Sequence, residues 1–131
     1  MSLSAISPLD GRYRDQTRVF VPYFSEFALI QHRIQVEVEW LWWMSRCPDI
    51  PSLRSLTEAE GQQLRALATQ FDEAGAARVK AIEAITRHDV KAVEYCLREA
   101  LTGRGLEGVS GWIHFGCHSE DINNLAYSWL V

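Results

Sequence analysis

The sequence has 131 residues, of which 47% are hydrophobic and 23% are charged. These values are typical of one folded domain and argue against an intrinsically disordered chain. The 17 acidic residues outnumber the 13 basic ones, so the net charge of −4 does not provide the basic surface of a nucleic-acid-binding protein.

The first 22 residues predict an extended arm with turns, because Pro8, Gly11 and Pro22 interrupt a stretch without apolar periodicity. A long helix is expected to follow, with Ser25 as its N-terminal cap and Pro48 as its stop. Its inward face is marked by residues at alternating steps of three and four, namely Phe27, Ile30, Ile34, Val38, Leu41 and Ser45.

Two other groups lie on this long helix. Glu37 and Glu39 are expected to be solvated or to form ion pairs at the surface. The tryptophans Trp40, Trp42 and Trp43 cannot share one helical face, so some of them must be covered by other elements or by another subunit.

Three more helices are predicted in the middle of the sequence. The first begins at Thr57, which has the spacing of a capping box with Glu60, and it continues to Phe71. The inward positions of the second are Val79, Ile82 and Ile85. The third begins near Asp89 as its expected N-terminal cap, and its inward positions are Val90, Val93, Leu97 and Leu101.

The last thirty residues predict a loop followed by a helix. Residues 102–111 contain four glycines and predict a loop, and the apolar run 112–115 fits either a strand or a buried helix. The final helix is expected from Ser119, and its pattern is still running at Val131, which indicates a longer protein or a surface for another chain. Its apolar positions are Ile122, Leu125, Ala126, Trp129 and Leu130. No hairpin signature is present, so the predicted fold class is all-α.

The sequence favours a cytoplasmic location. Its N-terminal residues lack the basic and apolar regions of a secretory signal, and its longest apolar cluster, residues 40–44, is too short to span a bilayer. Cys47, Cys96 and Cys117 are odd in number and lack C-x-x-C spacing, which favours free thiols in a reducing compartment.

Two groups of residues could bind an anion. Arg12 and Tyr13 offer a guanidinium and a phenol, although a surface arginine beside a packed tyrosine is the commoner outcome. His88 lies between Arg87 and Asp89 at a helix start, where free N–H groups attract anions and a histidine can titrate near neutral pH. The alternative there is a local salt bridge and an ordinary helix cap.

A third group, residues 112–121, brings His114, Cys117 and His118 to a second helix start. No further Cys or His has the spacing of a zinc site, so no metal is expected. Asn123 and Asn124 are unfavourable inside a helix, so their side chains are either held by polar contacts or simply exposed. No Ser-His-Asp triad, phosphate-binding loop or dinucleotide fingerprint is present.

These segments resemble the adenylosuccinate lyases, a family of the fumarase/aspartase superfamily. The resemblance rests on motifs that occur in family order: SPLDGRY at 7–13, FSE at 24–26, QVEV at 35–38, HDVKAVEY at 88–95, IHF at 113–115 and SEDINN at 119–124. Each motif alone is weak, but together they cover nearly the whole chain.

The resemblance implies a helical N-terminal lyase domain over residues 1–111, with residues 112–131 beginning a central helical bundle. It implies a homotetramer whose active sites are assembled from three subunits. It also implies cleavage of adenylosuccinate to AMP and fumarate, and the matching reaction on the succinyl-carboxamide ribotide of purine synthesis. This β-elimination requires a general base, a general acid and anion-binding groups, with no metal or organic cofactor.

The same resemblance implies roles for the candidate residues. Arg12 and Tyr13 are expected to bind the nucleotide phosphate, and His88 is expected to line the substrate pocket and assist the acid–base step. The further substrate-pocket residues implied are Asp89, His114 and Ser119. The principal general acid and the serine base of these enzymes lie beyond the part that the chain resembles, so these 131 residues alone are expected to be inactive.

Two positions depart from the family pattern and leave two functions open. Arg87 stands where the family usually has Asn, and His118 stands where it usually has Thr. Both larger side chains are expected to face the substrate, where they could retune its binding or mark an inactive homologue. The first hypothesis is therefore part of a lyase, and the second is a truncated or degenerate homologue that serves as a helical interaction module. Neither involves nucleic acid or a membrane.

Overall fold

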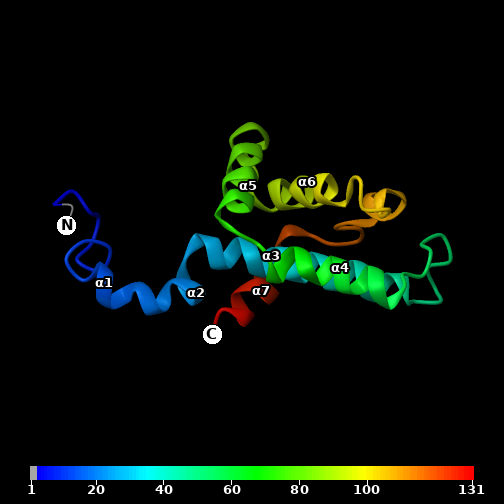
Figure 1. Cartoon of the computed structure of the whole chain (residues 1–131), viewed down its shortest axis with the longest axis horizontal. Helices are drawn as coiled ribbons and strands as arrows, with labels where there is room; N and C mark the ends of the chain where they lie inside the picture. The colour runs from blue at the N-terminus through cyan, green and yellow to red at the C-terminus, as the bar shows by residue number, and fades with distance from the viewer. Residues whose placement is uncertain (1–2) are drawn as a thin grey trace.

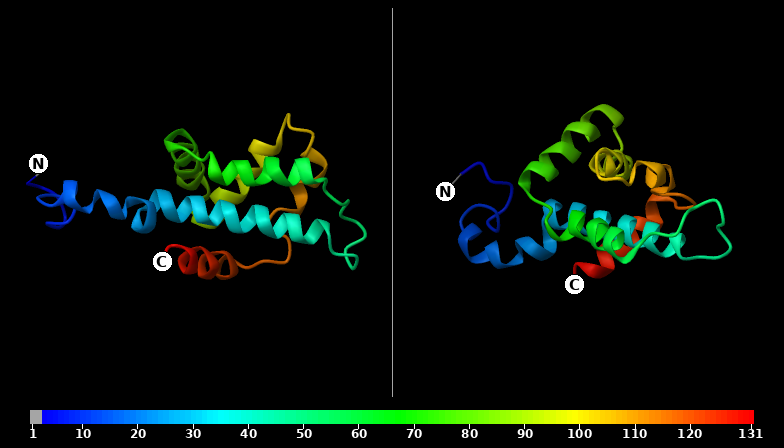
Figure 2. Two further views of the ribbon diagram at one scale, coloured as in Figure 1. Left: turned by 60° about the horizontal axis from the view of Figure 1, so that its bottom comes forward. Right: turned by 45° about the vertical axis from the view of Figure 1, so that its right-hand side comes forward.

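The long helix α3 (Glu26–Ser45) is the axis around which the body of the molecule packs (Figure 1). The structure, a computed structural model, describes residues 3–131. Helix α4 (Glu58–Thr69) returns along α3, and α7 (Ser119–Trp129) lies along a different side of it (Figure 2). Every regular element within the described residues is helical, which confirms the predicted all-α class. None of these helices is long and apolar enough to cross a membrane.

Helices α5 (Glu73–Thr86) and α6 (Asp89–Leu101) pack against each other and against α3. The stretch predicted as a loop after α6 is only partly irregular, because its second half forms the short 3-10 helix η2 (Glu107–Trp112). Leu106 and Val109 are buried there against the core. Burial of these two apolar side chains explains why a glycine-rich segment is ordered as a helical turn.

The main core confirms most of the inward face predicted for α3. Ile30, Ile34, Val38, Leu41 and Ser45 are buried. Phe27 is half-buried, and its ring packs against that of Phe71 with 5.2 Å between ring centroids. The inward position predicted for Ile85 is wrong, since that side chain is 84% exposed. Helix α5 buries only Val79 and Ile82 at its centre, so its last turn lies beyond the packed surface.

The three tryptophans of α3 are divided between the core and the surface, as their spacing predicted. Trp42 is buried, whereas Trp40 and Trp43 are exposed. Trp40 and Trp43 line an open groove of about 710 Å³ between α3 and α7. Leu125 and Trp129 of α7 also line this groove. These two residues belong to the apolar pattern of α7, and they are 49% and 41% exposed. The part of α7 that is buried against α3 and α6 is therefore narrower than its apolar pattern.

The N-terminal arm is more helical than predicted. Residues 14–24 form three consecutive short turns, α1 (Arg14–Thr17), η1 (Arg18–Phe20) and α2 (Val21–Phe24). Pro22 lies in the first turn of α2, where proline is tolerated because the N–H groups there have no helical partner. The arm extends from the start of α3 away from the rest of the molecule (Figure 1).

The capping box predicted at the start of α4 is present. Thr57 Oγ1 accepts from the Glu60 backbone N–H at 3.2 Å, and Glu60 Oε2 accepts from the Thr57 backbone N–H at 2.8 Å. Arg54 also donates two hydrogen bonds to the Glu60 carboxylate. These hydrogen bonds, chiefly those from Arg54, lower the pKa of Glu60 to about 2.

We expect Glu60→Gln to lower the free energy of unfolding at pH 7 by about 1 kcal/mol, a typical value for a helix cap. Because the folded-state pKa of Glu60 is depressed, its contribution is present above the ordinary value of 4.5 and is lost as the pH falls toward 2. Urea unfolding at several pH values should therefore show the difference narrowing in acid. The control is Glu58→Gln, which changes an exposed carboxylate outside the cap. A difference that stays constant down to pH 2 contradicts the prediction.

Candidate functional site

The starts of α6 and α7 lie close together beside α3. A small apolar cluster, separate from the main core, holds the three helices in this arrangement. It consists of Val36 from α3, Val90 from α6, and Ile122 and Ala126 from α7. Burial of these four side chains brings together two helix starts that are about thirty residues apart in the sequence.

The buried side chain of Arg33 links the two helix starts. Its Nη2 donates to Asp89 Oδ2 on α6 at 2.7 Å, and its Nε donates to Asn123 Oδ1 on α7 at 2.9 Å. The polar contact of Asn123 resolves one of the alternatives left open by the sequence. Arg33 itself was missed by sequence reasoning, although a charged residue between Ile30 and Ile34 on the inward side of a helix was an available signal.

Asp89 is the first residue of α6 and is half-exposed. Its burial acts to raise the pKa of the carboxyl group, but the hydrogen bond from the Val90 N–H and the charge of Arg33 outweigh that effect. The pKa of Asp89 is therefore below its ordinary value of 3.8, and the side chain is a carboxylate at neutral pH. The sequence predicted Asp89 as the N-terminal cap of α6, which is wrong by one position, because the cap is the preceding residue.

His88 is the residue that caps α6. Its Nδ1 accepts the backbone N–H of Lys91 at 3.2 Å, so the lone pair of Nδ1 is occupied. In the neutral ring the proton is then on Nε2, which lies 3.5 Å from Ser119 Oγ at the start of α7. The structure thus brings His88, Asp89 and Ser119 together, with an imidazole N–H directed at the serine hydroxyl.

His118 caps α7 in the same way. Its Nδ1 accepts the Glu120 backbone N–H at 3.3 Å, and its own backbone N–H donates to Asp121 Oδ2 at 2.7 Å. Burial, with the nearby charges of Glu37 and Asp121, raises the pKa of the adjacent Cys117 to about 11. This thiol is protonated at neutral pH. Within residues 3–131 no three His, Cys, Asp or Glu side chains are grouped as metal ligands.

His114 lies in the turn before α7, next to α3. Its Nδ1 is 2.6 Å from Glu37 Oε1, and its backbone has φ 65°, in the left-handed region. Glu37 is fully buried, so the surface position predicted for this residue is wrong, because the turn covers it. Burial raises the pKa of Glu37 above 4.5, although the hydrogen bond and charge of His114 act in the opposite direction. Glu39 forms the predicted ion pair, with Arg65 at 2.6 Å.

Arg87 ends α5 in a left-handed conformation, with φ 53° and ψ 33°. Its side chain is exposed beside His88. A left-handed conformation costs an ordinary residue roughly 1 kcal/mol, whereas Asn adopts it more readily.

We therefore expect Arg87→Asn to raise the free energy of unfolding by about 0.5–1 kcal/mol through relief of this backbone strain. Chemical denaturation measures the change. Arg87→Ala is the matched control, because it removes the same charged side chain but retains the unfavourable backbone conformation. Equal stability of the Asn and Ala variants would show that the backbone conformation at this position is not the cause of any gain in stability.

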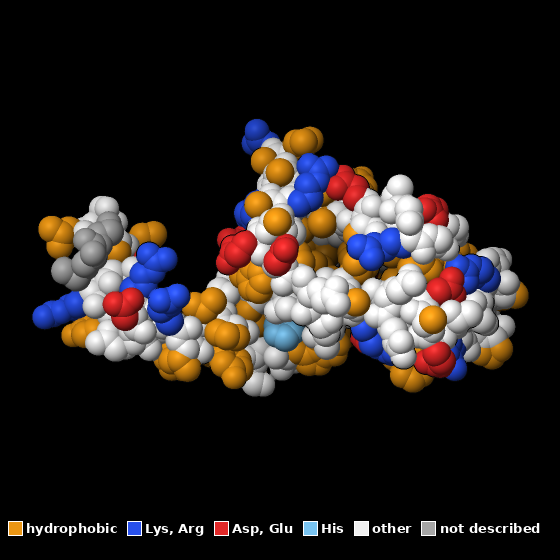
Figure 3. All heavy atoms as spheres, viewed as in Figure 1, with side chains coloured by type: hydrophobic (Ala, Val, Ile, Leu, Met, Phe, Trp, Pro, Cys, Tyr) orange, Lys and Arg blue, Asp and Glu red, His pale blue; other side chains and the backbone are white. Residues whose placement is uncertain are grey.

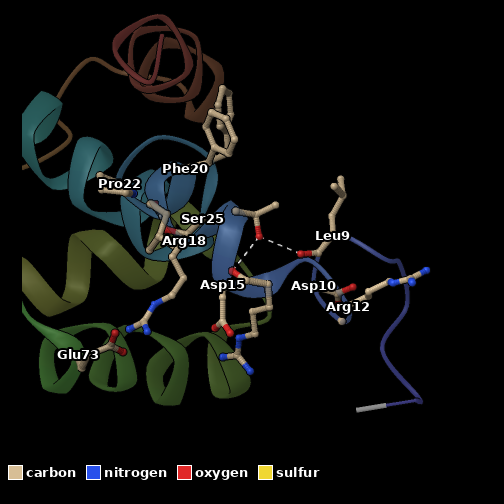
Figure 4. A pocket seen from close by; sticks show the side chains of 14 residues that line it. Leu9, Asp10, Arg12, Asp15, Arg18, Phe20, Pro22, Ser25 and Glu73 are labelled. Atoms are coloured by element: carbon tan, nitrogen blue, oxygen red, sulfur yellow. Dashed lines mark hydrogen bonds between the residues drawn. The ribbon is translucent and has the colours of Figure 1, made fainter. Parts of the chain in front are cut away.

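Arg12 and Tyr13 lie in the arm and not at the two helix starts. They are stacked, with the guanidinium carbon of Arg12 5.6 Å from the centre of the Tyr13 ring. Arg12 lines an open hollow of about 1100 Å³, whose lining within the described residues 3–131 comes from residues 9–25 and Glu73. In Figure 4 Arg18 extends toward Glu73 while Arg12 points elsewhere. Basic side chains gather on this arm (Figure 3), so it is a separate candidate for binding an anion.

No protein-family model matches the chain, but several curated proteins do. The adenylosuccinate lyases of Legionella pneumophila strain Corby and Escherichia coli K12 are each 44% identical to it over 131 residues. The adenylosuccinate lyase of Dictyostelium discoideum is 44% identical over 128 residues, or 95% of the chain. The two bacterial matches cover 99% of this chain but only 29% of each relative. The chain therefore spans less than a third of the relatives' length and corresponds to their N-terminal portion.

Proposed function

Because the chain is homologous to the N-terminal portion of the adenylosuccinate lyases, we propose that it supplies part of an active site that releases fumarate from adenylosuccinate. The succinyl-carboxamide ribotide of purine synthesis is the second proposed substrate, since it carries the same succinyl group. In this β-elimination a base removes a proton from one carbon of the succinyl group. The bond from its neighbouring carbon to nitrogen then breaks, and an acid protonates the leaving nitrogen.

The observation that carries the proposal is the meeting of the two helix starts, with His88 Nε2 at 3.5 Å from Ser119 Oγ. Both substrates carry two carboxylates and a phosphate, and the N-terminal ends of helices favour negative charge. His88 offers an N–H donor that can assist protonation or hold a carboxylate, and Ser119 offers a hydroxyl beside it. Asp89, held by Arg33 at 2.7 Å, is the fixed anion next to His88.

The remaining candidates are assigned around this centre. Arg12 and Tyr13 bind the nucleotide phosphate, which requires the arm to meet an active site formed with other parts of the assembled protein. His114 lies near the same substrate, and Arg87 and His118 face it from the two caps. The principal acid and base belong to regions that this chain does not match. The division into residues 1–111 and 112–131, the homotetramer, the cytoplasmic location and the absence of a cofactor are further parts of this proposal.

The test is an assay of the full-length protein with both substrates, in which fumarate and the product nucleotide are quantified separately. We expect the two products in equal amounts, and no turnover by the 131 residues alone. The control substrate is the adenylosuccinate nucleoside without its 5′-phosphate, for which we expect a higher KM. Failure of the full-length protein to release fumarate from either nucleotide refutes the proposed function.

A further inference from the structure

Glu37 is a buried acid, and the hydrogen-bonding partner of its carboxyl group is His114. Its side chain is 0% exposed, and its Oε1 lies 2.6 Å from His114 Nδ1. Its other oxygen, Oε2, is buried without a hydrogen-bond partner among residues 3–131. Burying a carboxylate is costly, and replacement by an apolar side chain of similar volume is often neutral for stability. The demands of folding therefore do not account for an acid at this position.

The turn that carries His114 is held against α3 at two points one helical turn apart. Glu37 contacts the His114 ring, and Trp40 Nε1 donates to the Phe115 carbonyl at 2.8 Å. His114 adopts its left-handed backbone between these two contacts. Such conformations persist where the surroundings fix them and are concentrated at functional sites. The two contacts thus fix both the path of the turn and the orientation of the imidazole.

The Glu37 contact also determines which ring nitrogen is protonated. An ionised carboxylate only accepts. When Glu37 is ionised, His114 Nδ1 therefore carries the proton, and Nε2 of the neutral ring keeps its lone pair. His88 and His118 are in the opposite state, because their Nδ1 atoms accept backbone N–H groups and their Nε2 atoms carry the proton. The site therefore contains histidines of both tautomers, one able to accept a proton and two able to donate.

We propose that Glu37 is a positioning residue, which orients His114 and holds it in the Nδ1-protonated tautomer so that Nε2 can accept a hydrogen bond or a proton. The consequence for turnover rests on the lyase function proposed above. The tautomer of His114 does not depend on that function, so the tautomer and the effect on turnover can be tested separately.

The first experiment measures the tautomers by long-range ¹H–¹⁵N NMR of the four histidine rings in this chain, with His114→Gln to assign the His114 signals. We expect Nδ1–H for His114 and Nε2–H for His88 and His118. Glu37→Leu should return His114 to the Nε2–H form favoured in water, and Glu37→Gln should retain Nδ1–H because the amide oxygen still accepts. Glu39→Gln, on the same helix but paired with Arg65, is the control and should change nothing.

The second experiment measures kinetics of the same variants in the full-length protein. Loss of orientation in Glu37→Leu should lower kcat about tenfold or more with little change in KM, and Glu37→Gln should recover most of it. An Nε2–H tautomer for His114 in the unmodified chain, or no change of tautomer in Glu37→Leu, overturns the inference. An unchanged kcat in Glu37→Leu overturns its catalytic part. If the unmodified protein has no lyase activity, the proposed function fails while the NMR result still decides the role of Glu37.

Discussion

Replacement of Arg33 by methionine is expected to lower the free energy of unfolding by about 2 kcal/mol, the typical loss for buried hydrogen bonds to a charged group. Methionine fills a similar volume, but it leaves Asp89 Oδ2 and Asn123 Oδ1 without their donor. Asp89 is half-exposed and can be hydrated, which limits the cost. For a chain of this length the change corresponds to a decrease in Tm of roughly 5–10 °C.

The pH dependence of this effect follows from Asp89. Its folded-state pKa lies below 3.8, so the stability that it contributes is present above that value and is lost as the pH falls. The difference between Arg33→Met and the unmodified chain should therefore shrink in acid. Arg78→Met is the control, because it removes an exposed ion pair with Glu99 and is expected to leave Tm almost unchanged. Equal effects of the two substitutions would contradict the structural role of Arg33.

The second large effect is expected in catalysis. His88→Asn should lower kcat of the full-length protein about 100-fold, the lower end of what a general acid–base group contributes. Asparagine is a good helix cap, so the start of α6 and the stability of the fold should be preserved. The substitution therefore removes the imidazole while retaining the local structure that His88 supports through Lys91.

His32→Asn is the matched control for this prediction. His32 lies on α3, where its Nδ1 is 3.3 Å from Gln35 Oε1, and it is not part of the helix starts. Steady-state kinetics and thermal unfolding of both variants separate the two roles of His88. A kcat within a factor of two of the unmodified enzyme would remove His88 from the mechanism. A fall in Tm without a fall in kcat would mean that His88 acts only as the N-terminal cap of α6.

Sequence patterns predicted the long helices well but placed residues near their ends less reliably. The face of α3 and the capping box of α4 depend on spacing within one helix, and both are confirmed. Asp89 was predicted as the cap of α6, whereas His88 has that position, because the choice between neighbouring polar residues depends on backbone geometry. Ile85 was predicted inward and is exposed, because burial requires a partner element that periodicity cannot reveal.

Residue patterns alone predicted the all-α class and the approximate helix bounds, and they include the family motifs that mark both helix starts. These properties follow from residue type and from interactions between near neighbours in the chain. Only the tertiary structure showed that α6 and α7 begin side by side, that Arg33 joins Asp89 to Asn123, and that Glu37 is buried against His114. The contacts of Arg33 and Glu37 join residues that are 56 to 90 positions apart, and the contact between the two helix starts joins residues 31 positions apart. Such contacts depend on how apolar faces pack together, and local periodicity carries no information about which distant polar groups the packing brings together.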